Sequence, residues 1–133
     1  MTLIKEKLIL VVDDHALTHK GLIKLFETES DLMVVSEAMN AEQAMEAIAK
    51  QKFDLAIVDI SMKGTNGLEL TKKMKLSHPD MIVLILSMHA AHIYAPYAIR
   101  AGASGFVSKN EEPENIINAI RQVLSGKIYI SDD

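Results

Sequence analysis

Residues 8–15 read Leu8-Ile9-Leu10-Val11-Val12-Asp13-Asp14-His15, a run of large apolar side chains that ends in two carboxylates. A continuous apolar run of this length is typical of a strand that is buried on both faces, as in a parallel sheet. Similar runs recur along the chain, and they end at Asp59, at Ser87 and just before Lys109. Ligands of open α/β sheets bind outside the carboxyl ends of the strands. The sequence therefore predicts a polar site along one edge of a parallel sheet.

Apolar runs alternate with amphipathic segments over the whole chain. We expect strands at 7–13, 33–37, 54–58, 81–86 and 105–108, and the second of these, the weakest, looks like an edge strand. Helices are expected at 16–28, 41–51, 67–77, 91–101 and 113–125, where apolar residues share one side. Asn40 suits the N-cap of the second helix, Pro113 the first turn of the last helix, and Gly126 its end.

Segment 91–101 is the least regular of these helices, because it contains Pro96. Proline lacks the backbone N–H and clashes with the preceding helical turn. We therefore expect a short helix that begins near Pro96, or a helix kinked there, which ends at Gly102. The order of elements predicts right-handed crossovers and an α/β three-layer sandwich, with helices on both faces of a five-stranded parallel sheet.

Length and composition narrow the class of protein. A chain of 133 residues, about half of them hydrophobic, suits one domain with one core. The net charge of −4 argues against direct binding of nucleic acid, and the absence of cysteine excludes disulfides and thiolate metal sites. We find no apolar stretch of about 18 residues and no apolar signal-peptide core near the N-terminus, so no membrane contact is expected. We expect a cytoplasmic protein.

Five short motifs together carry a family resemblance. They are Val11-Val12-Asp13-Asp14-His15, Ile57-Val58-Asp59-Ile60-Ser61-Met62, Asn66-Gly67-Leu68-Glu69-Leu70, Leu86-Ser87-Met88 and Gly105-Phe106-Val107-Ser108-Lys109. With these motifs in this order, essentially the whole chain resembles a receiver domain of a bacterial two-component response regulator. The resemblance implies the flavodoxin-like (βα)5 fold, with strand order 2-1-3-4-5.

Further details resemble the NarL/FixJ (LuxR-type) subgroup, notably Leu86-Ser87-Met88-His89 and the run Gly126-Lys127-Ile128-Tyr129-Ile130-Ser131. Members of that subgroup usually carry a C-terminal helix-turn-helix domain that binds DNA. We therefore expect a receiver domain at 1–126, followed at 127–133 by a tail or by the start of a linker to an absent domain.

The resemblance implies a role for each residue at the sheet edge. Asp59 would be the phosphoacceptor, and Asp13, Asp14, Asp59 and the backbone carbonyl of Ser61 would bind Mg²⁺. Mg²⁺ suits such a site because it prefers hard oxygen ligands and retains several waters. Asp14 could equally cap the helix that begins near His15, because a carboxylate is favourable at a helix N-terminus.

Three residues beyond the acidic cluster also receive roles from the resemblance. Lys109 would pair with Asp59 and then with a phosphoryl oxygen, and Ser87 would donate its hydroxyl to the phosphoryl group. Phe106 occupies the position of the family's aromatic switch, although a core phenylalanine in a buried strand is the simpler interpretation. Lys63 stands where the family often has proline, and it adds a positive charge near the incoming phosphate.

The histidines suggest no catalytic group. His89 and His92 are expected at the surface, and His15 could modulate the acidic pair without a catalytic role of its own.

The sequence thus predicts a phosphorylation-controlled switch rather than an enzyme, although the domain would assist its own phosphorylation and dephosphorylation. A sensor histidine kinase or a phosphotransfer protein would supply the phosphoryl group. Phosphorylation would then favour a homodimer and control transcription through the absent DNA-binding domain. The alternative is a stand-alone receiver that acts in a phosphorelay or by protein–protein contact.

Two other classes of α/β protein fit poorly. Phosphatases resembling the haloacid dehalogenases have a second aspartate two residues after the nucleophile, where this chain has His15 or Ala16. A flavodoxin that carries FMN needs a phosphate-binding loop after the first strand, and the carboxylates of Asp13 and Asp14 would repel a phosphate.

Overall fold

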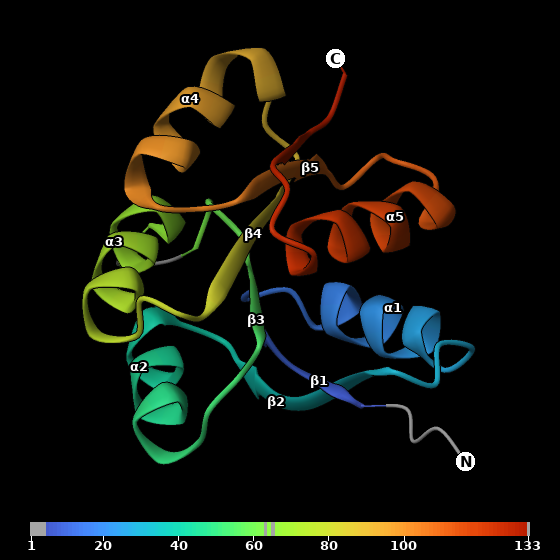
Figure 1. The fold of residues 1–133 in the computed structure, drawn as a ribbon. Coiled ribbons are helices and arrows are strands. Elements are labelled where there is room, and N and C mark those ends of the chain that lie inside the picture. Colours follow the sequence, from blue (N-terminus) through green and yellow to red (C-terminus); the bar gives the residue numbers. More distant parts are fainter. Residues whose placement is uncertain (1–4, 63, 65, 133) are drawn as a thin grey trace.

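Strands and helices alternate along the chain in the computed structural model, which describes residues 5–62, 64 and 66–132 (Figure 1). Lys63 lies outside the described residues. The strands are β1 (Lys7–Val12), β2 (Leu32–Ala38), β3 (Leu55–Val58), β4 (Ile82–Ser87), β5 (Gly105–Ser108) and β6 (Tyr129–Ile130). The helices are α1 (Ala16–Phe26), α2 (Ala41–Lys50), α3 (Gly67–Ser77), α4 (Ala91–Ala101) and α5 (Pro113–Leu124).

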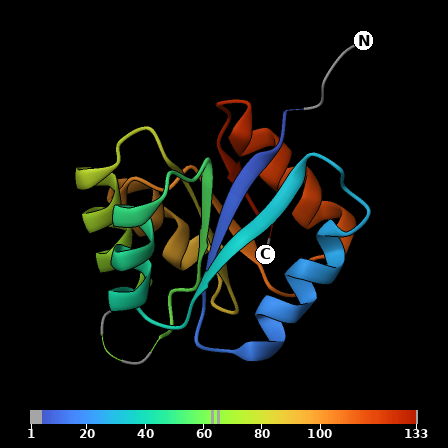
Figure 2. The same cartoon turned by 90° about the horizontal axis from the view of Figure 1, so that it is seen from below.

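The strands form one parallel sheet between two layers of helices. Its order is β2-β1-β3-β4-β5-β6, so β2 is an edge strand, as predicted. Helices α2, α3 and α4 cover one face and α1 and α5 cover the other (Figures 1 and 2). Successive β1 residues face opposite layers, because strand side chains alternate: Leu10 and Val12 pack toward α2, and Ile9 and Val11 pack toward α1. Burial on both faces explains the continuous apolar runs.

The sheet corrects our prediction of five strands, because the described part of the chain forms six. Strand β6 lies within segment 127–133, where we expected a tail or linker, and pairs in parallel with β5. The backbone N–H of Tyr129 donates to Ser104 O (3.1 Å), and that of Ser131 donates to Phe106 O (2.9 Å). A strand of two residues carries too short a pattern to be recognised in a sequence.

Glu111, in the loop between β5 and α5, fastens this sixth strand to the domain. Its Oε2 accepts hydrogen bonds from the hydroxyls of Tyr129 and Ser131, both at 3.0 Å. The Ser131 hydroxyl oxygen also accepts the backbone N–H of Ser108 at 3.0 Å. Burial together with the bond to Glu111 raises the pKa of Tyr129. The C-terminal segment is therefore joined to the loop that follows Lys109.

Glu111→Ala is expected to loosen β6 without unfolding the domain. Hydrogen bonds to a charged group contribute about 1.5–3 kcal/mol each, so amide hydrogen exchange at Tyr129 and Ser131 should quicken by about tenfold or more. Glu112→Ala is the matched control, because the described residues show no side-chain cap bond from Glu112 to α5. Unchanged exchange in the Glu111 variant would show that backbone pairing alone holds β6.

Helix α4 excludes one of the two expectations for segment 91–101. The helix begins at Ala91 rather than near Pro96, and Pro96 lies in its interior. Four alanines of α4 are buried in the fold: Ala91, Ala95, Ala98 and Ala101. Packing of this small-residue face outweighs the one backbone hydrogen bond that Pro96 cannot make. Gly102 ends the helix as predicted, with φ of 109°, whereas a kink at Pro96 stays a prediction.

The remaining helix ends follow local sequence signals. Asn40 accepts the N–H of Gln43 at the start of α2, as predicted, and Asn66 accepts two N–H groups at the start of α3. No helix within the described residues is both long enough and apolar enough to cross a membrane.

Candidate functional site

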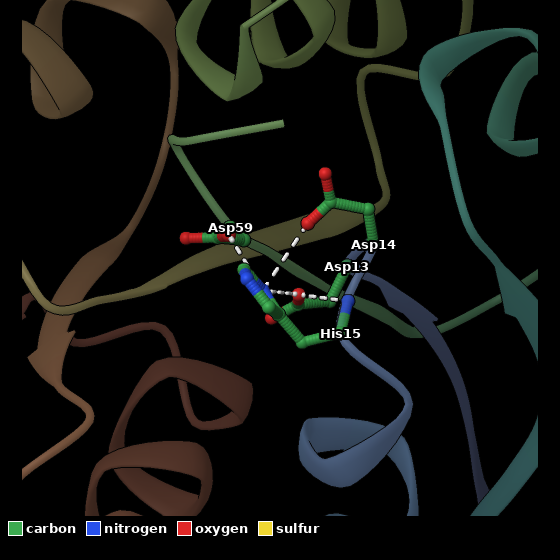
Figure 3. A group of neighbouring side chains, drawn as sticks. All are labelled: Asp13, Asp14, His15 and Asp59. Carbon is green, nitrogen blue, oxygen red and sulfur yellow. Dashed lines mark hydrogen bonds and ion pairs between the residues drawn. The ribbon is translucent and has the colours of Figure 1, made fainter. Parts of the chain in front are cut away.

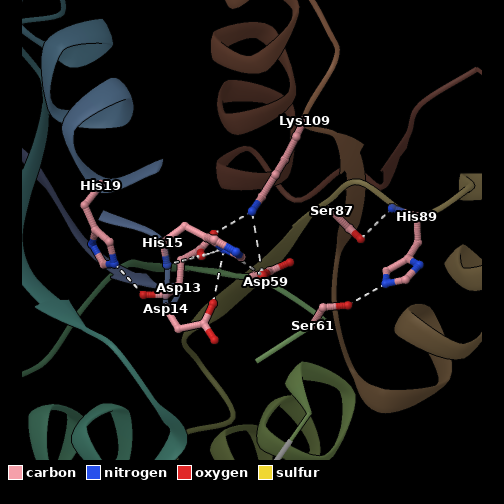
Figure 4. A network of polar contacts seen from close by, with 9 residues as sticks. All are labelled: Asp13, Asp14, His15, His19, Asp59, Ser61, Ser87, His89 and Lys109. Carbon is pink, nitrogen blue, oxygen red and sulfur yellow. Dashed lines mark hydrogen bonds and ion pairs between the residues drawn. The ribbon is translucent and has the colours of Figure 1, made fainter. Parts of the chain in front are cut away.

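The predicted polar residues meet at the carboxyl edge of the sheet. Asp13 and Asp14 follow β1, Asp59 follows β3, Ser87 closes β4, and Lys109 lies just after β5 (Figure 4). Neighbouring strands fix the backbone of the two buried aspartates: Asp13 N–H donates to Ala38 O and Asp59 N–H donates to Val12 O, both at 3.0 Å. The regular hydrogen bonding of the parallel sheet thus fixes the backbone positions from which these two side chains extend.

The side chain of Lys109 extends from the end of β5 into the acidic cluster. Its Nζ lies 2.7 Å from Asp13 Oδ2 and 3.7 Å from Asp59 Oδ2. Its backbone N–H donates to Ser87 O at 2.8 Å, which fixes the start of the side chain. The predicted approach of Lys109 to Asp59 is present, but the closer partner of the ammonium is Asp13.

The two buried aspartates differ in their electrostatics. Burial alone would raise the pKa of Asp13, but hydrogen bonds from Lys109 and His15 outweigh it and hold that pKa below its usual value. Burial raises the pKa of Asp59, the nearby charge of Asp13 adds to this, and Lys109 only partly opposes it. Among the described residues Asp59 Oδ2 finds no hydrogen-bond partner. Asp59 is therefore the carboxylate with unused capacity to bind.

The cluster has the donors that a divalent cation needs. One ligand atom each from Asp13, Asp14, His15 and Asp59 can be chosen so that all lie within 4.8 Å of one another (Figure 3). Three of these atoms are carboxylate oxygens, which suit Mg²⁺. A cation would also satisfy the buried oxygen of Asp59 and reduce the repulsion between the carboxylates. The residues present therefore fit a divalent metal ion.

The alternative role of Asp14, as the cap of helix α1, is not seen among the described residues. The N-cap residue is His15, and within the described part of the chain no side-chain bond caps this helix. The backbone N–H of His15 donates instead to Asp13 Oδ1 at 2.8 Å. Ser61, the fourth predicted ligand, is exposed, and its backbone N–H bonds to the carboxylate of Asp59. The role of its carbonyl in metal binding stays a prediction.

Ser87 lies beside the cluster (Figure 4), and both Ser87 and Phe106 are fully buried. The hydroxyl oxygen of Ser87 accepts the backbone N–H of His89 at 3.0 Å, which leaves its proton available to a ligand. Phe106 packs in the apolar layer between the sheet and helices α2, α3 and α4. This position agrees with a core residue, and its role as a switch stays a prediction.

Histidines contribute more to the site than the sequence indicated. His15 Nδ1 lies 2.8 Å from Asp13 Oδ1 and 3.1 Å from Asp14 Oδ1. The buried His19 holds the Asp13 backbone carbonyl through Nε2 at 2.6 Å. His89, only partly exposed, contacts the Ser61 hydroxyl across the site (Figure 4). The signal for His15 was its place beside the acidic pair, whereas a single residue letter reveals no contact of His19 or His89.

Glycine at position 67 is a further requirement of the site. A Cβ on Gly67 would overlap the backbone carbonyl oxygen of Asp59 and lie 2.9 Å from Ile60 Cα. The backbone N–H of Gly67 also donates to Ile60 O at 2.9 Å. Helix α3 thus begins directly against the backbone that carries Asp59.

A parallel α/β sheet with an acidic cluster and a lysine at its carboxyl edge is the arrangement of a known class of signalling domain. The family model described as the response regulator receiver domain matches residues 9–121. The chain therefore belongs to the response regulator receiver domain family.

Similar proteins come from several bacteria. The response regulator UvrY of Escherichia coli strain K12 is 35% identical over 125 residues, which are 94% of this chain and 57% of UvrY. The response regulator GacA of Pseudomonas aeruginosa strain PAO1 is 34% identical over 123 residues, 92% of this chain and 58% of GacA. The chain thus spans a little over half the length of these curated relatives.

Solved structures confirm the fold. A two-component response regulator of the LuxR family from Aurantimonas sp. SI85-9A1 superposes with a TM-score of 0.91 at 31% identity, covering 97% of this chain and 92% of that one.

Proposed function

We propose that this domain is a Mg²⁺-dependent phosphoacceptor and that Asp59 receives the phosphoryl group. The observation that carries the proposal is the state of Asp59: a carboxylate 4% exposed at the carboxyl edge of the sheet, with an oxygen that lacks a hydrogen-bond partner among the described residues. The ammonium of Lys109, 3.7 Å from this oxygen, is positioned to meet an incoming phosphoryl group.

The transfer forms one bond to phosphorus and breaks another. One oxygen of the Asp59 carboxylate attacks the phosphorus of a phosphohistidine on a sensor kinase or phosphotransfer protein, the P–N bond breaks, and the donor imidazole leaves with its electron pair and takes up a proton. A magnesium ion held by Asp13, Asp14 and Asp59, with the Ser61 carbonyl, would supply compensation for the negative charge. Lys109 exchanges its bond to Asp13 for one to a phosphoryl oxygen, and Ser87 donates its hydroxyl.

These new bonds would carry the signal away from the site. Ser87 precedes the loop into α4, and Lys109 lies in the loop into α5, so both loops are drawn toward the phosphoryl group. Such contacts bias an existing equilibrium between inactive and active conformations. The surface made by segments 91–101 and 105–125 changes, and the buried ring of Phe106 would act as the switch that links Ser87 to this surface. Glu111 extends this effect to β6, because it bonds to both Tyr129 and Ser131.

The output would be control of transcription in the cytoplasm, through a DNA-binding domain outside this chain. Relatives longer than this chain support this, among them one named transcriptional regulatory protein DegU, from Brevibacillus brevis, at 33% identity. A homodimer formed on phosphorylation would match the symmetric half-sites of such regulators. The domain itself would be no enzyme beyond assisting its own phosphorylation and dephosphorylation.

Intact-mass spectrometry after incubation with acetyl phosphate tests the proposal. Wild type should gain one phosphoryl group with Mg²⁺ and none with EDTA. Lys109→Gln should slow the gain by about 100-fold, because it removes a positioned charge from the transition state. Lys127→Gln, which changes an exposed lysine after α5, is the matched control. Incorporation that is equal with Mg²⁺ and EDTA, or equal in the two lysine variants, would contradict the proposed site.

A further inference from the structure

His15 places an imidazole nitrogen inside the ring of carboxylates. Its Nδ1 lies 2.8 Å from Asp13 Oδ1, 3.1 Å from Asp14 Oδ1 and 3.9 Å from Asp59 Oδ2 (Figure 3). The three oxygens come from residues that follow two strands, β1 and β3, and the nitrogen comes from the residue that precedes helix α1. The His15 side chain is 62% exposed, so it can move without disturbing the core.

Without a cation, the 2.8 Å contact is a hydrogen bond between His15 and Asp13. In the neutral tautomer that carries its proton on Nε2, Nδ1 has a free lone pair, and the same separations suit atoms that share one metal ion. Ligand atoms about 2.1 Å from an ion are about 3.0–3.4 Å apart when adjacent and about 4.2 Å apart when opposite. The nitrogen-to-oxygen distances of 2.8–3.9 Å fall close to this range, and the largest separation in the set, within 4.8 Å, needs only a small closure. An independent observation points to a cation at the same place. Asp59 is 96% buried, and its Oδ2 lacks a hydrogen-bond partner among the described residues.

The donor set is unusual for magnesium. Mg²⁺ takes oxygen ligands and retains several waters, whereas imidazole suits Zn²⁺, Ni²⁺ and Co²⁺. We propose that His15 Nδ1 is a fourth protein ligand for such borderline divalent ions, together with Asp13, Asp14 and Asp59. The inference rests on the proposed function in one respect, namely that the same carboxylates hold Mg²⁺. It adds that this domain discriminates poorly against borderline ions, because His15 strengthens their binding and leaves that of Mg²⁺ unchanged.

Binding of Co²⁺ to the untagged chain tests this proposal, because the visible absorption of Co²⁺ reports its ligands. Calorimetry should show that His15→Ala weakens Co²⁺ binding by about tenfold or more, while Mg²⁺ affinity stays within about twofold of wild type. The Co²⁺ spectrum should change in the same variant. His92→Ala, at an exposed histidine of α4, is the matched control and should behave as wild type.

Three outcomes would overturn the inference. Co²⁺ affinity and spectrum that are the same in wild type and His15→Ala would show that the imidazole is not a ligand. Equal changes in Mg²⁺ and Co²⁺ affinity would assign His15 a general electrostatic effect. Loss of Co²⁺ binding in His92→Ala would locate the ion elsewhere. Failure of phosphoryl transfer leaves these measurements unaffected, so the two proposals fail separately.

Discussion

Asp59→Asn is expected to abolish incorporation of the phosphoryl group, because an amide oxygen cannot replace the carboxylate as the nucleophile. The variant keeps the size of the side chain and the backbone bond to Val12, so it should fold. Asp80→Asn, at an exposed aspartate before β4, is the matched control and should be phosphorylated as wild type. Intact-mass spectrometry with acetyl phosphate and Mg²⁺ measures both. Normal incorporation in the Asp59 variant would remove Asp59 from the proposed role.

The same substitution should raise the free energy of unfolding of the metal-free protein at neutral pH. Burial, and the charge of Asp13 in addition, raises the pKa of Asp59 above its ordinary value of 3.8. Between 3.8 and that raised pKa the folded state binds more protons than the unfolded state, so the wild type loses stability as the pH rises. Asparagine does not ionise, so the variant does not lose this stability as the pH rises.

Urea unfolding in EDTA measures this difference as a function of pH. The advantage of Asp59→Asn should be absent below a pH of about 3.8, grow through the window above it, and then stay constant. The contribution of Asp13 to stability has the opposite dependence on pH. Its lowered pKa means that its contribution to stability is present above 3.8 and is lost as the pH falls through the folded-state pKa. A variant of Asp59 that is less stable than wild type at neutral pH would contradict the account.

Phe106→Ala is expected to cause a large loss of stability. The ring is 0% exposed and pairs in register with Ile85 of β4, in the layer beneath α4. Truncation of a buried phenylalanine leaves a cavity and costs about 3–5 kcal/mol, which urea unfolding should detect. Phe106→Leu keeps most of the volume and should cost less than about 1.5 kcal/mol. Equal, small losses in both variants would show that the pocket collapses around the missing ring.

The sequence predicted most of the sheet because the buried strands carry a local pattern. Runs such as Leu55–Val58 are apolar on both faces, and a polar residue marks the end of each. The sixth strand, β6, lacks such a pattern, since backbone bonds to β5 and the carboxylate of Glu111 hold it. Helix α4 spans the expected segment 91–101, and of the two expectations for Pro96 only a helix that begins there is excluded. Burial of its four alanines depends on contacts with the rest of the fold, and that packing outweighs the local effect of Pro96.

The sequence predicted which residues meet at the candidate site, because the strand ends determine their backbone positions. Strand ends brought Asp13, Asp59 and Lys109 to one edge, as the resemblance implied. The side-chain partners were not predictable, because they depend on rotamers and on contacts between distant segments. Neither the closer pairing of Lys109 with Asp13 nor the hydrogen bond between His89 and Ser61 can be inferred from residue letters.

The identity of the phosphorylated residue tests the central claim most directly. Borohydride reduces an aspartyl phosphate to homoserine, which marks the acceptor in a peptide map of the wild-type protein. After incubation with acetyl phosphate and Mg²⁺, the account predicts homoserine at position 59 and unmodified aspartate at positions 13 and 14. Homoserine at either of those two positions, with Asp59 unmodified, would contradict it.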